Sequence, residues 1–319
     1  MDIFLNVIFL IIGMVFLVKG ADFFVEGSSK IAKALKIPSL IIGLTLVSMG
    51  TSAPEASVSI NSAVNGLNDM SLGNVVGSNI FNTLFILGIS ALIVPLAISR
   101  DMKRYDIPIM VGLYSILLVL GFVITPFTLD RIESIILLIL FVGYMFFLVV
   151  RAKRSGVEES EEVMEKRSPM WKNIVFSLIG LAGIIWGGDI VVDNASELAM
   201  TLGMSEALVG LTIVAVGTSL PELVTSVIAS IKKEDDIALG NVIGSNIFNI
   251  IFILGLSSTI TPLAFSMDAL LDLSVMLVSG ILVIGVSLMS KNMKRWQGII
   301  FIALYCIYLG YIIFRNYSM

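Results

Sequence analysis

A repeat at a constant offset constrains this chain more than any other feature. The segment GTSAPE at 50–55 returns as GTSLPE at 217–222. A second motif, LGNVVGSNIFN at 72–82, returns at the same offset as LGNVIGSNIFN at 239–249. When the stretch from Gly43 to Ser99 is aligned without gaps on 210–266, 31 of 57 positions are identical. Two unrelated apolar segments do not share this much, so the chain contains a duplicated unit.

The composition indicates that both copies lie in a membrane. Hydrophobic residues make up 57% of the chain, charged residues only 14%, and the mean hydropathy is +1.01. Apolar stretches of about 20 residues, long enough to cross a bilayer, recur ten times. We therefore predict an all-α integral membrane protein with ten transmembrane helices, five in each repeat. The expected spans are 3–25, 38–64, 70–95, 106–126, 132–150, 173–192, 205–231, 237–262, 270–290 and 296–314.

The positions of the basic residues predict the orientation of these helices. Lys and Arg near helix ends collect on the cytoplasmic side. Of the 20 basic residues, only Arg131 and Arg315 fall on the opposite side of a ten-helix map. This distribution predicts N- and C-termini outside. Since each repeat has an odd number of helices, the second repeat is expected to be inverted, as in many secondary transporters. The expected parts are the first repeat at 1–150, a cytoplasmic linker at 151–170 and the second repeat at 171–319.

The scarcity of reactive side chains excludes several functions. The sequence has no His and one Cys, Cys306. Intramembrane proteolysis by a Ser–His pair or a His-bound zinc ion is therefore excluded. We expect neither enzymatic turnover nor a resident cofactor, and nothing in the sequence indicates nucleic-acid binding.

Two glutamates stand out because they lie well inside apolar stretches. Glu55 and Glu222 each cost roughly 2.5 to 3.5 kcal/mol at the bilayer centre, so a functional role is the default interpretation. Thr51 and Ser52 precede Glu55 by four and three residues, which places them on the same side of a helix. Thr218 and Ser219 repeat this spacing before Glu222. Pro54 and Pro221 lack an N–H and are expected to open the helix beside each glutamate.

The second motif adds further oxygen atoms and close helix packing. Ser78 and Asn82 are four residues apart, as are Ser245 and Asn249, so each pair follows one helix stripe. Glycines at 73, 77, 240 and 244 form small-xxx-small patterns that predict closely packed helices. Carboxylate, hydroxyl, amide and carbonyl oxygens without nitrogen or thiolate ligands are typical of a Ca²⁺ site. Because two carboxylates balance one Ca²⁺ or two Na⁺, competition for one pocket predicts an antiporter.

With these motifs, essentially the whole chain resembles the cation/calcium antiporter superfamily, and in particular the prokaryotic sodium/calcium exchangers. The resemblance implies that helices 2, 3, 7 and 8 enclose a row of cation sites and that helices 1 and 6 slide to alternate access. It implies Glu55 and Glu222 as shared Ca²⁺ and Na⁺ ligands. The other implied ligands are Thr51, Thr218, Ser78, Ser245, the carbonyls of Ser48 and Ala215, and, in the middle of the row, Ser52, Ser219, Asn82 and Asn249.

One position departs from the family pattern. Several members carry Asp where this chain has Asn249, and here Asn82 is an amide as well. The loss of an anion argues against K⁺ co-transport and leaves the Na⁺ stoichiometry open. We expect export of Ca²⁺ in exchange for Na⁺ across a prokaryotic plasma membrane. Exchange of Ca²⁺ for H⁺ through the same two glutamates is the main alternative, whereas a cation channel is disfavoured because paired sites in one inverted chain are typical of transporters.

Overall fold

The structure, a computed structural model, describes residues 3–154, 169–204, 213 and 215–317, and most of them are helical. Elements from the first half of the sequence are α1 (Ile3–Leu35), α2 (Ser39–Ile42), η1 (Gly43–Val47), α3 (Ser48–Thr51), α4 (Ala53–Val64), α5 (Asn68–Ile80), η2 (Phe81–Ile86), α6 (Leu87–Ile93), β1 (Leu96–Ala97), η3 (Met102–Asp106), α7 (Ile107–Val119), η4 (Leu120–Ile124), β2 (Thr128–Leu129) and α8 (Arg131–Arg154). Elements from the second half are α9 (Met170–Thr201), α11 (Ala215–Gly217), α12 (Leu220–Ile231), α13 (Asp235–Phe248), η6 (Asn249–Leu254), α14 (Gly255–Ile260), β3 (Leu263–Ala264), α15 (Met267–Met289), β4 (Asn292–Met293) and α16 (Arg295–Tyr317).

The helices agree with a multi-pass membrane protein. Within the described residues, eight continuous helical stretches are long and apolar enough to cross a bilayer. They coincide with eight of the ten expected spans. The other two expected spans, 38–64 and 205–231, are not continuous helices of that length. The shorter apolar helix Ser39–Thr51 lies in the first span and Leu220–Ile231 lies in the second. Residues 205–212 and 214 of the second span are outside the described residues. Ten crossings therefore remain a prediction.

Both helix breaks lie beside the prolines that predicted them. Ser52 separates α3 from α4, with φ −80° and ψ 9°, and Ser219 precedes α12 with φ −92° and ψ 6°. Proline stands in the first turn of each following helix, where its missing N–H costs nothing. The two breaks are equivalent in the repeat, so the duplicated sequence produces the same local structure twice.

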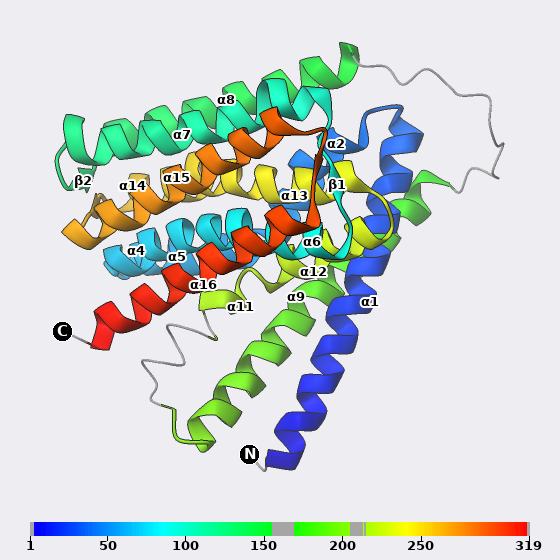
Figure 1. Ribbon diagram of the computed structural model, residues 1–319, viewed down its shortest axis with the longest axis horizontal. Helices are drawn as coiled ribbons and strands as arrows, with labels where there is room; N and C mark the ends of the chain where they lie inside the picture. Colours follow the sequence, from blue (N-terminus) through cyan, green and yellow to red (C-terminus); the bar gives the residue numbers. More distant parts are fainter. Residues whose placement is uncertain (1–2, 155–168, 205–212, 214, 318–319) are drawn as a thin grey trace.

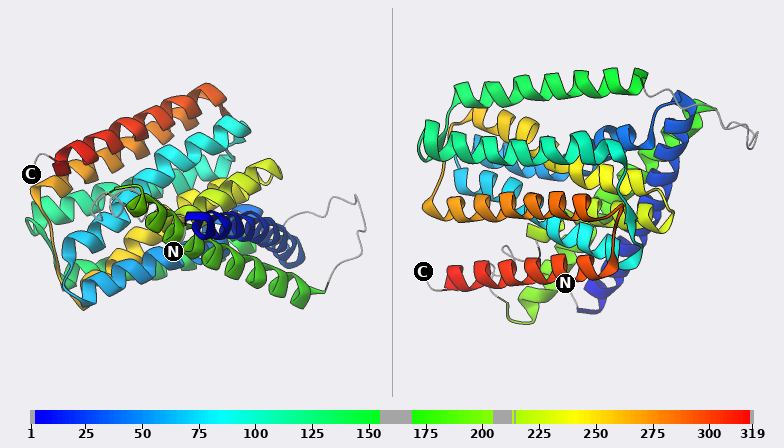
Figure 2. Two further views of the ribbon diagram at one scale, coloured as in Figure 1. Left: turned by 90° about the horizontal axis from the view of Figure 1, so that it is seen from below. Right: turned by 45° about the horizontal axis from the view of Figure 1, so that its top comes forward.

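The helices α1 and α9 form a tilted pair that crosses the other helices steeply (Figures 1 and 2). Glycines bring the two backbones close together. A Cβ added at Gly20 would lie 2.7 Å from the backbone nitrogen of Ile184, and one at Gly187 would lie 2.7 Å from that of Leu17. Such an interface of small residues is typical of closely packed membrane helices.

The remaining helices form a bundle around α13, in which the two sequence halves are interleaved. Every residue of α13 from Ile237 to Phe248 is buried, although three are polar. Helices at the periphery instead expose large apolar side chains, including Phe146 on α8, Leu288 on α15 and Ile307 on α16. Extensive apolar exposure is expected where the surrounding solvent is lipid hydrocarbon.

Two short β-ribbons, which the sequence did not predict, repeat the internal symmetry. β1 pairs antiparallel with β4, with Leu96 opposite Met293, and β2 pairs with β3, with Leu129 opposite Leu263. Leu96 and Leu263 occupy equivalent positions in the two copies of the repeat. The β1–β4 ribbon connects the segment between α6 and η3 to the segment between α15 and α16. The β2–β3 ribbon connects the equivalent pair of segments at the other end of the bundle.

Candidate cation site

Glu55 and Glu222 lie in the middle of the bundle and are completely buried, with side chains that are 0% exposed. Each occupies the first turn of the helix that follows a break, Glu55 in α4 and Glu222 in α12. The N-terminus of a helix carries a partial positive charge and free N–H groups, so it stabilises a carboxylate. The prolines that break the helices therefore also create the local environment that tolerates the glutamates.

Hydroxyl groups connect each glutamate to the opposite repeat. Ser52 donates a hydrogen bond of 2.8 Å to Oε1 of Glu222, and Ser219 donates one of 2.9 Å to Oε1 of Glu55. These contacts are equivalent in the repeat and cross between its copies. They confirm that the two GTSxPE segments, which are far apart in the sequence, meet in one place.

The serines of the second motif adjoin the same groups. The Ser219 hydroxyl lies 3.1 Å from that of Ser78. Ser245 lies 3.4 Å from Oε1 of Glu222 and 3.3 Å from the carbonyl oxygen of Ser48. The structure thus brings Ser78, Ser245 and the Ser48 carbonyl to the glutamates. Ala215 is the first residue of α11, and the role of its carbonyl remains a prediction.

Two asparagines that the sequence analysis did not single out position the glutamate helices. Asn74 donates to the Ser59 hydroxyl at 2.8 Å and to the carbonyl oxygen of Glu55 at 3.2 Å. Asn241 makes the equivalent bonds to Ser226, at 2.9 Å, and to Glu222, at 3.3 Å. Their occurrence in both copies of the LGNVxGSNIFN motif was the signal that could have identified them.

The threonines before the glutamates also contact these asparagines. Thr51 donates to Oδ1 of Asn241 at 2.9 Å, and Thr218 donates to Oδ1 of Asn74 at 3.4 Å. Each threonine is therefore paired with the asparagine of the opposite repeat. Thr51 and Asn241 are both fully buried, whereas Thr218 and Asn74 are partly exposed.

The amides at the end of the second motif form a further buried network. Asn82 donates to Oδ1 of Asn246 at 3.2 Å, and Asn249 donates to Oδ1 of Asn79 at 3.0 Å. Asn246 in turn donates to Thr83 at 2.9 Å. Asn79 and Asn246 were also missed in the sequence, although both belong to the repeated SNIFN segment. Their contacts hold the amides of Asn82 and Asn249 in fixed orientations.

Four buried oxygen atoms of the glutamates and the amide network have no hydrogen-bond partner among the described residues. Buried polar atoms are nearly always hydrogen-bonded, so such exceptions require an explanation. The four atoms form two equivalent pairs: Oε2 of Glu55 and of Glu222, and Oδ1 of Asn82 and of Asn249. Among the described residues, no Lys or Arg forms an ion pair with either glutamate. Two uncompensated carboxylates together with amide and hydroxyl oxygens suit a hard cation such as Ca²⁺.

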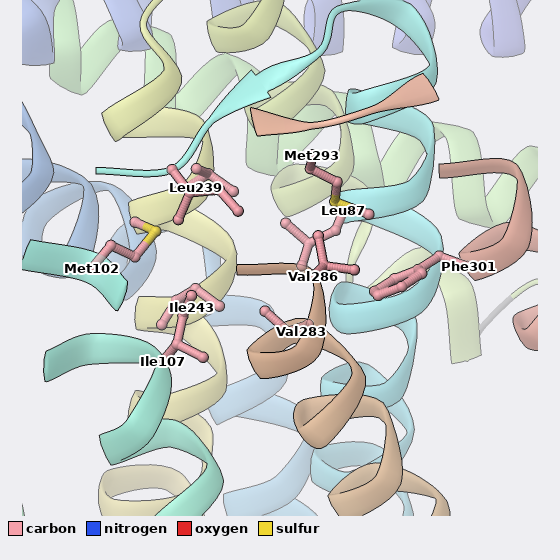
Figure 3. Close-up of a pocket in the computed structure, with 10 residues that line it drawn as sticks. Leu87, Met102, Ile107, Leu239, Ile243, Val283, Val286, Met293 and Phe301 are labelled. Atoms are coloured by element: carbon pink, nitrogen blue, oxygen red, sulfur yellow. The ribbon is translucent and has the colours of Figure 1, made fainter. Parts of the chain in front are cut away.

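A small cavity elsewhere in the bundle does not suit an ion. It lies beside the β1–β4 ribbon and is lined by apolar side chains that include Met102, Ile243 and Phe301 (Figure 3). Its volume is about 10 Å³, which is at the lower limit for a single water molecule. The glutamate region is therefore the better candidate for ion binding.

The close packing predicted for the glycines of the second motif is present at the second copy, Gly240 and Gly244. A Cβ added at Gly244 would lie 2.7 Å from the Ser48 hydroxyl oxygen, and one at Gly240 would lie 2.9 Å from Cα of Gly43. The predicted close approach is thus confirmed where α13 packs against η1 and α3. The segment that would face Gly73 and Gly77 at the equivalent positions includes 207–212, which lies outside the described residues, so the prediction is not tested there.

Comparison with known proteins gives consistent results. The family model for "Sodium/calcium exchanger protein" matches residues 5–150 and 172–314. Inner membrane protein YrbG of Escherichia coli is 39% identical over 86% of this chain and 87% of its own length. The sodium/calcium exchanger MaX1 of Methanosarcina acetivorans is 35% identical over 95% and 97%, respectively.

Solved structures of the sodium-calcium exchanger NCX_Mj have the same fold. The structure soaked with zero Na⁺ and Ca²⁺ superposes with a TM-score of 0.85 at 31% identity, covering 97% of this chain and 99% of that one. The structure soaked with 10 mM Na⁺ and 10 mM Sr²⁺ gives a TM-score of 0.85 at 32% identity, with the same coverage. Family model, relatives and fold agree, and the chain belongs to the sodium/calcium exchanger family as a multi-pass membrane protein of the prokaryotic type.

Proposed function

We propose that this protein exchanges Na⁺ for Ca²⁺ across the membrane and that the glutamate region binds both ions. The observation that carries the proposal is the symmetric set of four buried, unpartnered oxygens, two from Glu55 and Glu222 and two from Asn82 and Asn249. The names of relatives such as MaX1 and NCX_Mj agree with this pair of ions.

The charge of the site accounts for coupling between the ions. One Ca²⁺ or two Na⁺ neutralise the two glutamates, so either load removes the repulsion between buried carboxylates. Ser52, Ser219, Ser78 and Ser245 contribute hydroxyl oxygens near the carboxylates, while Thr51, Thr218 and the carbonyls of Ser48 and Ala215 extend the oxygen-lined path. Because both ions use the glutamates, binding of one excludes the other, and this competition drives exchange rather than co-transport.

Alternating access follows from the inverted repeat. We infer ten crossings with both termini outside, which places the Thr218–Asn74 pair on the outer side of the glutamates and Thr51–Asn241 on the inner side. The outer pair is partly exposed and the inner pair fully buried, which supports a state that opens outward. The glycine contacts between α1 and α9 support sliding of these helices as a pair. The expected physiological direction is Ca²⁺ export.

The test is a flux measurement on purified protein in sealed vesicles. ⁴⁵Ca²⁺ uptake is driven by an outward Na⁺ gradient, with the membrane potential clamped and pH gradients collapsed. Uptake that requires the Na⁺ gradient is the expected result. Uptake that appears only with an outward H⁺ gradient would contradict Na⁺ coupling while keeping the site, and uptake through an ohmic conductance without counter-ion would contradict exchange altogether.

Matched variants link the flux to the site. Glu55→Gln keeps the size of the side chain and removes its charge, whereas Glu26→Gln makes the same change at an exposed position in α1. We expect the first variant to lose uptake and the second to retain it. Normal uptake by Glu55→Gln, in protein that remains monodisperse, would refute the site assignment.

A further inference from the structure

A groove of about 480 Å³ lies between α15 and α16, far along the chain from both glutamates. Apolar side chains form most of it, including Leu271, Val278 and Leu282 from α15 and Leu304 and Ile307 from α16. Its floor is Leu84 from η2, which is fully packed inside the protein. Val278 and Ile307 are exposed, so the groove opens on the outer surface of the bundle.

The groove lies at the depth of the lipid hydrocarbon. Leu271 is four residues after the first residue of α15, and the lining continues to Leu282, a distance of about 17 Å along the helix axis. The lining begins about one helical turn from the start of α15 and ends past the middle of this 23-residue helix. Since the surrounding solvent there is hydrocarbon, an acyl chain is the natural occupant of an apolar groove.

Charged side chains gather at the end of the groove that faces the headgroups. Arg315 donates to both carboxylate oxygens of Asp272, at 3.3 and 3.1 Å, and the Tyr308 hydroxyl donates to the same carboxylate at 3.1 Å. The guanidinium also lies over the ring of Tyr311, with 5.6 Å between its carbon and the ring centroid. Because Tyr308 and Tyr311 line the groove, this cluster and the groove are continuous.

The cluster carries one surplus negative charge. Asp272 and Arg315 neutralise each other through two hydrogen bonds. Asp268 is the second carboxylate, and its closest approach to Arg315 is 3.9 Å. Its side chain is 44% exposed, against 17% for Arg315. A carboxylate that remains exposed beside a compensated ion pair favours a ligand with a cationic group.

We propose that this groove binds a phospholipid with an amine headgroup, such as phosphatidylethanolamine, from the leaflet nearest the C-terminus. One acyl chain lies in the groove on Leu84, the ammonium pairs with Asp268, and the phosphate lies on the Arg315 side of the cluster. The bound chain then touches η2 next to Thr83, which accepts a hydrogen bond from Asn246 in the buried amide network. A lipid in the groove therefore contacts the segment that carries part of the cation site.

Native mass spectrometry of the purified full-length protein tests this proposal. The protein is mixed with equal amounts of phosphatidylethanolamine and phosphatidylglycerol that carry identical acyl chains. We expect preferential retention of one phosphatidylethanolamine. Val278→Trp fills the groove and should lower the retained lipid about tenfold, equivalent to about 1.4 kcal/mol. Leu288→Trp is the matched control, because Leu288 is on the same helix, highly exposed and outside the groove, and it should change nothing.

A second variant tests the headgroup separately from the acyl chain. Asp268→Asn should abolish the preference between the two lipids while retaining lipid in the groove. Equal binding of both lipids by the wild-type protein, or a preference for phosphatidylglycerol, would overturn the amine assignment. Unchanged lipid retention in Val278→Trp would overturn the assignment of the groove as the lipid site. If Val278→Trp fails to fold, Ser274→Leu provides the same test. A protein dimer that Val278→Trp dissociates would also overturn the assignment, because the groove would then be covered by a second copy of the chain.

Discussion

The two copies of the repeat have nearly the same motifs but different surroundings. Thr51 and Asn241 are fully buried, and the Thr51 hydroxyl lies 2.9 Å from Oδ1 of Asn241. The equivalent Thr218 and Asn74 are partly exposed, and the corresponding distance is 3.4 Å. Gly244 is pressed against Ser48 and Leu44, whereas the residues that would face Gly77 at the equivalent positions include 211, which lies outside the described residues. The Thr51–Asn241 side of the site is thus more deeply buried than the Thr218–Asn74 side.

This difference shows how a symmetric sequence supports an asymmetric structure. If the identical motifs dictated a single packing, both pairs would be equally buried. Their surroundings instead differ in burial, and with the inverted repeats that we propose, exchanging these two packings would open the site to the opposite side. The proposed transport cycle therefore needs no new kind of contact. The contacts present in one copy of the repeat would form in the other copy.

The largest loss of transport is expected at the two glutamates, which are equally buried in the two copies of the repeat. Glu55→Gln and Glu222→Gln each remove one of two buried charges, and loss of such a charge typically costs about 2 to 5 kcal/mol, so uptake should fall by at least about 25-fold in both. The measurement is Na⁺-driven ⁴⁵Ca²⁺ uptake in vesicles. A variant that retains a tenth of wild-type uptake would show that its half is not essential.

Substitutions at two helical glycines should change the thermal stability in opposite directions. Gly244→Ala introduces a Cβ 2.7 Å from the Ser48 oxygen and 2.8 Å from Cα of Leu44. Overpacking of this kind costs about 1 to 3 kcal/mol, so the thermal unfolding temperature in detergent should fall. Gly112→Ala on α7, where no described residue lies within 4 Å of an added Cβ, should leave it unchanged or raise it, because Ala is about 0.5 to 1 kcal/mol better than Gly in a helix.

Transport by Gly77→Ala sharpens the comparison of the two copies. If the packing seen at Gly244 forms at Gly77 in the opposite state, Gly77→Ala should slow exchange several-fold. A Gly77→Ala variant with both normal stability and normal exchange would argue against an interchange of the two packings. Gly112→Ala on α7, where no described residue lies within 4 Å of an added Cβ, is the control.

The asparagines beside the glutamate helices should show a smaller difference. Asn241→Ala leaves Ser226 and the Glu222 carbonyl without their buried partner, at a cost of about 1 to 3 kcal/mol. Asn74→Ala removes the equivalent bonds in a partly exposed place, where water replaces them, so its cost should be clearly lower. Equal losses of thermal stability in the two variants would contradict the difference in burial.

Much of the site could be predicted from local sequence patterns. The constant offset between the two copies identified the equivalent positions, and the prolines identified the helix breaks, because each copy of a motif is a short, continuous stretch of chain. Burial of Glu55 and Glu222 followed from the lack of other charges in the same apolar stretches. The crossed bonds from Ser52 and Ser219 then confirmed that the two segments meet.

The parts that the sequence did not predict depend on packing between distant segments. Asn74, Asn241, Asn79 and Asn246 resemble other polar residues of membrane helices until their partners are known. The difference in burial between Thr51 and Thr218 has no counterpart in the motifs, because both precede a glutamate by four residues. The β1–β4 and β2–β3 ribbons are only two residues long on each side, too short for a periodic pattern.

The smallest effect is expected from adding a charge at the amide network. Asn249→Asp and Asn82→Asp each introduce a third carboxylate into the buried amide network, at equivalent positions in the repeat. The added charge should increase monovalent-cation binding several-fold and make exchange more sensitive to acid pH, because a protonated third carboxyl loses its extra charge. Uptake measured against Na⁺, K⁺ and pH tests this, with Asn68→Asp at the start of α5 as a control. If the two packings interchange during the cycle, both variants should shift the profile alike; a shift in only one would mean that the halves bind ions differently throughout the cycle.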